Sequence, residues 1–132
     1  MLTDLDLPLL PIWVIRAAVA AVWLYEGLWC KLLGRGAGQL EVAQAVPFLG
    51  SRWAGRFLRL LGTAELGIAL WVLSGVLPGL CAVTQTGLLV SLNTAGISWA
   101  RRRIHDPAGM VLKNAALLTL AWVAAALPRV IP

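Results

Sequence analysis

Four long apolar stretches dominate this sequence of 132 residues, at about residues 10–33, 57–77, 80–100 and 108–127. A membrane-spanning helix needs about 20 mostly apolar residues, because the hydrocarbon core of a bilayer is about 30 Å thick. The chain is 60% hydrophobic and only 13% charged, with a mean hydropathy of +0.83. Soluble domains are about half apolar and about a quarter charged. We therefore predict an all-α membrane protein, a four-transmembrane-helix bundle forming a single domain over residues 1–132.

Short segments with turn-forming residues separate the four runs. Leu77, Pro78 and Gly79 predict a tight turn between the second and third runs. Asp106 and Pro107 precede the fourth run, where aspartate is a preferred N-cap and proline suits the first helical position. The first run exceeds the length of a signal peptide and ends without a small-residue cleavage site, so we expect a retained span.

The loop between the first two runs, GRGAGQLEVAQAVPFLGSRW, contains a short helical pattern. Leu40, Ala43 and Val46 recur at near-helical spacing before Pro47 ends the pattern. We predict a short interfacial helix over about residues 39–46, lying along the membrane surface between the first two spans. It could act as a lid over a site between the helices or serve only as a connector.

Basic residues flank two of the loops, and cytoplasmic loops carry such an excess of lysine and arginine. We therefore predict a multi-pass protein of the bacterial inner membrane with both long loops in the cytoplasm and both termini periplasmic or extracellular. The net charge of +5 reflects this topology, and we expect no nucleic acid as a partner. The flanking basic residues are Lys31, Arg35, Arg52, Arg56, Arg59, Arg101, Arg102, Arg103 and Lys113.

Polar side chains inside the apolar runs recur at one depth. With a rise of about 1.5 Å per residue, Glu26, Glu65, Asn93, Lys113 and Asn114 all lie roughly 8–12 Å from the loop side. Ionised groups at the bilayer centre cost about 2.5–3.5 kcal/mol, so they face a partner or a cavity. These residues predict a ligand-binding or proton-handling layer between the helices. The two asparagines alone could instead serve only as hydrogen-bonding groups between helices.

Helical-wheel positions indicate where the charged groups of this layer point. Gly62 and Glu65 share a face of the second run, and small residues there allow close helix packing. Glu26 and Glu65 are both expected to point into the bundle. Lys31 lies about 140° from Glu26 around an α-helix, so we expect it to extend toward the headgroups rather than pair with Glu26.

The other residues with reactive or polar side chains predict no further site. Gln85 and Arg16 lie toward the opposite membrane face at a shared depth and could pair. Cys30 and Cys81 fall near opposite ends of the membrane, farther apart than the roughly 7 Å between Cα atoms that a disulfide allows. His105 is the only histidine, which excludes bis-His haem ligation and a multi-His metal site within one chain.

Three motifs occur in order along nearly the whole sequence: WLYEGLWCKLL, LGTAELGIALWVLSG and DPAGMVLKNAALL. Together they resemble the DoxX-like family. The resemblance implies a bacterial four-helix membrane bundle, associated with quinone-linked oxidation as a small membrane subunit of an oxidoreductase. The residues that match the family pattern are Glu26, Gly27, Lys31, Glu65, Lys113 and Asn114.

A membrane subunit of a redox system, with a quinone or other lipophilic ligand in the polar layer, is the function that these residues favour. Glu26 or Glu65 would accept or relay the proton that quinone chemistry moves. Asn93, Lys113 and Asn114 would bond the ligand's oxygens. Tryptophans such as Trp23 would stack on its ring. The electrons would pass through a partner redox subunit, because the sequence shows no intrinsic cofactor and no independent catalytic motif.

Two other functions remain open from the sequence. A small proton-coupled transporter of lipophilic molecules could also use an intramembrane glutamate. A scaffold or assembly partner without a ligand would use the polar layer only for helix specificity. Membrane lipids are partners in every case, and glycine and alanine at helical spacing permit a homo-oligomer.

Overall fold

The computed structural model describes residues 10–35 and 38–130, and these residues form helices joined by short connections. Helix α1 (Ile12–Leu24) continues directly into a π-helix, η2 (Tyr25–Leu32). The short helix α2 (Gln39–Gln44) precedes the long helix α3 (Gly50–Ser74). Helix α4 (Pro78–Ala100) runs into a 3-10 turn, η3 (Arg101–Arg103), and α5 (Pro107–Val130) follows.

Four of these segments are long and apolar enough to cross a membrane: Ile12–Leu32, Gly50–Ser74, Pro78–Arg103 and Pro107–Ala126. The predicted all-α four-helix bundle is therefore confirmed, and the protein is a multi-pass membrane protein. Many large apolar side chains lie on the outside of the bundle, among them Leu60, Leu70 and Leu112. Such an apolar exterior suits a protein whose solvent is lipid rather than water.

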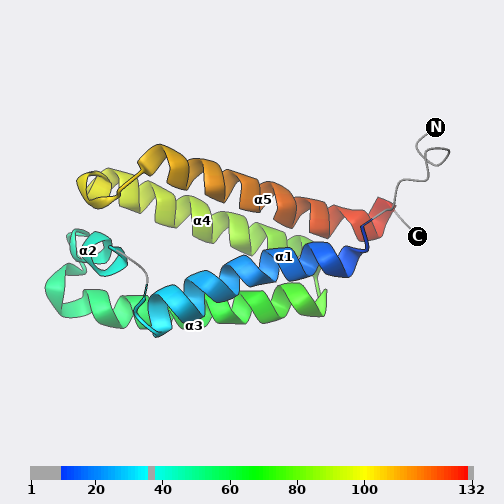
Figure 1. Ribbon diagram of the computed structural model, residues 1–132, viewed down its shortest axis with the longest axis horizontal. Coiled ribbons are helices and arrows are strands. Elements are labelled where there is room, and N and C mark those ends of the chain that lie inside the picture. Colours follow the sequence, from blue (N-terminus) through cyan, green and yellow to red (C-terminus); the bar gives the residue numbers. More distant parts are fainter. Residues whose placement is uncertain (1–9, 36–37, 131–132) are drawn as a thin grey trace.

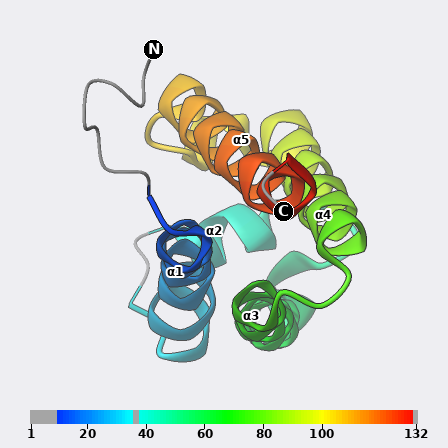
Figure 2. The same ribbon diagram turned by 90° about the vertical axis from the view of Figure 1, so that its right-hand side faces the viewer.

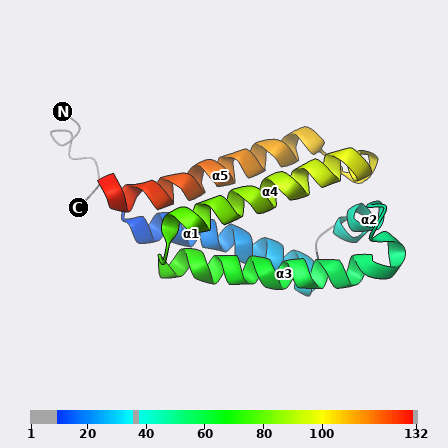
Figure 3. The same ribbon diagram turned by 180° about the vertical axis from the view of Figure 1, so that it is seen from behind.

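The bundle consists of two helix pairs. The α1–η2 segment packs mainly on α3, and α4 packs mainly on α5, while α1 and α5 provide the broadest contact between the pairs. Figure 2 shows this arrangement from one end. The pairs lie close together where α3 turns into α4 and diverge toward the opposite end, where α2 contacts both α3 and α4 (Figures 1 and 3). We call the end that holds α2 and η3 the loop end.

The core of the bundle lies in the half away from the loop end. Small residues there, such as Ala20, Ala69 and Ala121, let the helices approach closely. Trp23 fills the largest space among the buried residues, with only 1% of its surface exposed. The remaining buried members of this cluster are Val19, Ile68, Val72, Cys81, Leu89 and Leu117.

The boundaries of α3 differ from the sequence-based estimate at both ends. Helix α3 begins at Gly50 rather than near Phe57, because the basic segment before Phe57 continues the helix beyond the apolar run. It ends at Ser74, since Gly75 adopts a left-handed conformation with φ of 69°. Leu77 is also left-handed, with φ of 45°, and α4 begins at the following proline.

The start of α5 follows the predicted capping pattern. Pro107 is the first helical residue. The backbone N–H of Gly109 donates to Oδ1 of Asp106 at 3.0 Å. This bond satisfies one of the N–H groups that the first turn of a helix leaves without a partner. The predicted N-cap at Asp106 is confirmed.

Replacing Asp106 with alanine removes this cap, so the free energy of unfolding should fall by about 1 kcal/mol. Asparagine caps a helix about as well as aspartate, and Asp106→Asn should therefore retain the stability of the parent. Unfolding of detergent-solubilised protein in a denaturing detergent, followed by circular dichroism, measures both. Equal losses for the two variants would contradict a capping role.

Candidate functional site

The π-helix η2 sets the geometry of the polar groups at the loop end of α1. In this segment the backbone N–H of Leu33 donates to the carbonyl of Leu28, five residues earlier, at 2.8 Å. Bonding over five residues widens the helix and brings residues i and i+5 closer to one face than an α-helix does. Glu26 and Lys31 have this spacing. Widened turns of this kind are frequent at functional sites.

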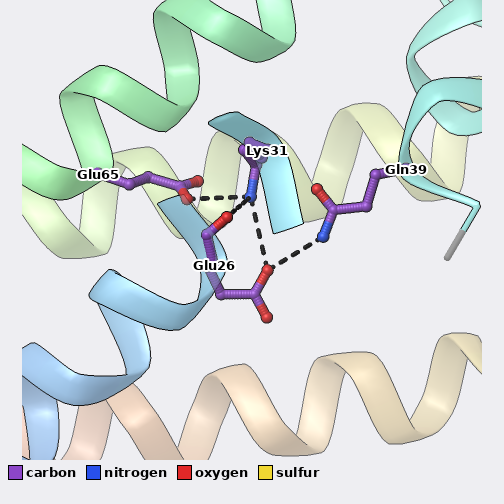
Figure 4. A network of polar contacts seen from close by, with 4 residues as sticks. All are labelled: Glu26, Lys31, Gln39 and Glu65. Carbon is purple, nitrogen blue, oxygen red and sulfur yellow. Dashed lines mark hydrogen bonds and ion pairs between the residues drawn. The ribbon is translucent and has the colours of Figure 1, made fainter. Parts of the chain in front are cut away.

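Lys31 is the centre of a network that joins two membrane segments (Figure 4). Its ammonium donates to Oε2 of Glu65 on α3 at 2.9 Å and contacts Oε2 of Glu26 at 3.5 Å. It also donates to the backbone carbonyl of Glu26 at 3.4 Å. The side chains of Lys31 and Glu65 are only 8% and 3% exposed. The short Lys31–Glu65 contact is thus a charge-assisted bond away from solvent, the stronger class of hydrogen bond.

Two glycines let the helices that carry this pair approach each other. A Cβ atom added to Gly27 would lie 2.7 Å from the carbonyl oxygen of Gly62, and one added to Gly62 would lie 2.8 Å from the carbonyl oxygen of Gly27. Neither distance is compatible with a real side chain. The backbones of η2 and α3 therefore touch at these two positions, directly beside Lys31 and Glu65.

Glu26 differs from Glu65 in its environment. Its side chain is 39% exposed, and in Figure 4 its carboxylate extends away from Glu65, toward the ribbon of α5. Gln39, the first residue of α2, donates its amide N–H to Oε2 of Glu26 at 3.1 Å. Within the described residues, Oε1 of Glu26 has no hydrogen-bond partner. The network therefore presents one accessible carboxylate oxygen, held in place by Lys31 and Gln39.

The prediction that Lys31 extends to the headgroups instead of pairing with Glu26 is wrong. The 140° offset assumes about 100° per residue of α-helix, and the π-helix, with a smaller rotation per residue, reduces that offset. The five-residue spacing of Glu26 and Lys31, part of the quoted motif, was a signal for the pairing. The contact of Gln39 was also missed, because nothing in the sequence shows that α2 folds back over the end of η2.

Trp23 and Gln85 form a second polar contact, in the core and apart from the Lys31 network. The indole N–H of Trp23 donates to Oε1 of Gln85 at 2.8 Å, and both side chains are buried. Trp23 thus fills the core instead of offering a ring face to a ligand. Gln85 also donates to the carbonyl of Cys81. The bonding capacity of Gln85 is used by these partners rather than by Arg16, whose guanidinium packs against Gly75.

The polar residues of α4 and α5 form a pair of their own. Asn114 donates to Oδ1 of Asn93 at 3.0 Å, and Asn93 donates to the carbonyl of Leu89 at 2.7 Å. Within the described residues no hydrogen bond joins this pair to the Lys31 network. Lys113 is exposed. The single predicted layer is therefore two groups, a charged one on α1–η2 and α3 and an amide one on α4 and α5.

No group of three or more metal-binding side chains forms among the residues that the structure describes. The thiols of Cys30 and Cys81 are both free and buried. The chemistry of the charged network is consequently that of two carboxylates, one ammonium and one amide.

The glycine contact gives the first test of this geometry. Gly62→Ala should lower the free energy of unfolding by about 1–3 kcal/mol, because the added methyl group must push η2 away from α3. Gly67 lies on the same helix with no atom near its missing side chain, so Gly67→Ala should be neutral or stabilising by up to about 1 kcal/mol. Unfolding titrations in detergent compare the two. Equal effects would contradict a close backbone approach at Gly62.

The ion pair gives the second test. Lys31→Met leaves the buried Glu65 carboxylate without its cation and should cost about 3–5 kcal/mol. The double variant Lys31→Met with Glu65→Gln should recover much of this loss, since no buried charge then remains without a partner. The same unfolding titrations give the coupling energy from the double-mutant cycle. Strictly additive effects would show that Lys31 and Glu65 do not interact.

Comparison with known proteins extends these observations to a family. The model of the DoxX-like family matches residues 20–122, a range that contains the charged network and both asparagines. No curated protein and no solved structure matches the chain with significance. Because the family model covers most of the sequence, the chain belongs to the DoxX-like family.

Proposed function

We propose that this protein is a small membrane subunit of a redox system and that it binds a quinone or similar lipophilic ligand beside Glu26. One observation carries the proposal: a half-exposed carboxylate within a membrane-spanning segment is held by a lysine whose other contacts are buried. Ionisable groups within membrane spans are costly and are typical of ligand and proton pathways. Glu65 alone would balance the charge of Lys31. Pairing this lysine therefore does not account for the presence of Glu26.

Glu26 has the properties of a proton acceptor for such a ligand. Oxidation of a quinol to a quinone releases two electrons and two protons, and a positioned carboxylate can take up a proton from the hydroxyl group. Oε1 of Glu26 is the atom available for this contact. Lys31 and Gln39 hold Oε2 and act as positioning residues. The electrons pass to a partner redox subunit.

The other groups near the loop end would orient the ligand. The Gln39 amide has a second N–H besides the one given to Glu26 and can donate to a ligand oxygen. Asn114 likewise donates one N–H to Asn93 and keeps another. These amides would replace Lys113 and Trp23 in the ligand-binding role expected from the sequence, because Lys113 is exposed and Trp23 is buried in the core.

The same network also supports a proton-coupled transporter of lipophilic cations. Two carboxylates share one ammonium, so the network carries an excess negative charge when all three groups are ionised. A lipophilic cation could occupy the position that a proton otherwise takes on Glu26. Proton release on addition of such a cation to the purified protein would favour this function.

The distribution of charge also supports an orientation. The loop end carries Arg35, Arg52 and Arg56 together with the three arginines of η3. By the positive-inside rule we place this end on the cytoplasmic side of a bacterial inner membrane, with the termini on the other side. Glu26 would then exchange protons with the cytoplasmic face.

The test is titration of the detergent-solubilised protein with a short-chain ubiquinone and its quinol, followed by tryptophan fluorescence and thermal melting. Glu26→Gln should weaken quinol binding by about 10- to 100-fold, the effect of losing a hydrogen bond to a charged group. Glu41→Gln removes the same charge from the exposed face of α2 and should leave binding unchanged.

Two outcomes would overturn the proposal. In the first, neither form of the ligand changes the fluorescence or the melting temperature of the parent protein. In the second, Glu26→Gln and Glu41→Gln both bind the ligand as the parent does. The first outcome, with folding and cellular role intact in Glu26→Gln, would favour a scaffold without a ligand.

A further inference from the structure

An open hollow of about 660 Å³ lies at the loop end, beside the 3-10 turn η3. All three residues of η3, Arg101, Arg102 and Arg103, line it, together with Ser98 and Trp99 from the last turn of α4. Figure 3 shows this end of α4 next to α2. The hollow is separate from the Lys31 network, which lies between η2 and α3.

We propose that this hollow binds the headgroup of an anionic phospholipid. Three arginines line this space, and no carboxylate is among its lining residues. Guanidinium groups match the geometry of phosphate oxygens and can bind them in a bidentate way. Ser98 adds a hydroxyl donor. Basic pockets at the cytoplasmic ends of membrane helices are suited to anionic headgroups.

The apolar side of the hollow identifies a lipid rather than a free anion. Trp99 lines the hollow and is 45% exposed, and its ring packs edge-to-face on the ring of Phe48 with centroids 5.4 Å apart. Phe48 is 71% exposed. Aromatic rings of this kind sit at the level of the lipid headgroups. Ile97, also in the lining, continues the apolar surface toward the membrane interior, where an acyl chain would lie.

The other arginines of the loop end have different surroundings. Arg52 and Arg56 lie over the ring of Trp53, at 5.2 and 5.1 Å from its centroid, and Arg35 lies over Trp29 at 4.8 Å. Within the described residues, neither an ion pair nor a cation–π contact engages Arg101, Arg102 or Arg103. Topology alone requires only that the loop be basic. It does not require three arginines to line one hollow that has no carboxylate in its lining.

The two sets of arginines give a matched experiment. The full-length protein in neutral detergent micelles is titrated with dioleoylphosphatidylglycerol, dioleoylphosphatidylcholine or inorganic phosphate, and lipid binding is followed by native mass spectrometry and thermal melting. Replacing Arg101, Arg102 and Arg103 with glutamine should weaken binding of phosphatidylglycerol by about 100-fold. Replacing Arg35, Arg52 and Arg56 with glutamine removes the same charge from the same end and should change it by less than about threefold.

Single Arg→Gln substitutions in η3 provide a second set of variants with smaller changes, each expected to weaken binding by about fivefold. Three results would overturn the proposal. The first is that phosphatidylcholine binds as tightly as phosphatidylglycerol. The second is that inorganic phosphate stabilises the protein as strongly as the lipid. The third is that the two triple variants lose lipid binding equally. Specific loss in the η3 variants with phosphatidylglycerol alone supports it.

Discussion

The bond between Lys31 and Glu65 is the interaction on which the loop end of the bundle depends. Two charged groups buried within membrane segments are tolerated only when they are paired with good geometry. Their 2.9 Å contact joins η2 to α3 and fixes the distance and rotation of these helices. The Gly27–Gly62 contact lies beside this bond and lets the two backbones come close enough for it to form.

The π-helix also explains why one lysine can serve two carboxylates. In a regular α-helix Glu26 would point well away from Lys31. Lys31 would then pair with Glu65 alone. The wider turn stacks Glu26 on Lys31, while Gln39 from α2 holds its carboxylate from the other side. A carboxylate that is half-exposed and yet fixed in position is suited to receive a ligand's proton, because it is both accessible and oriented.

The sequence predicted the features that depend on hydrophobic length and local capping. The four membrane segments follow from the apolar runs, and the start of α5 follows from Asp106 and Pro107. The polar layer was only partly predictable. Depth along a helix placed Glu26, Glu65 and the asparagines correctly at the loop end. A regular wheel could not give the rotation at Lys31, and depth along a helix could not show that Lys113 is exposed.

The two polar groups of the bundle have different chemical roles because they sit on different helix pairs. Amides on α4 and α5 satisfy each other, which neutral groups can do at low cost in lipid. Charges on η2 and α3 need a counter-charge, and the Lys31–Glu65 bond supplies it. The pairs diverge at the loop end, where α2 contacts both (Figure 1). The Glu26 carboxylate extends toward α5, on the side of the first pair that faces this divergence (Figure 4), so the ligand that we propose would lie between the two pairs and apart from the Lys31–Glu65 bond.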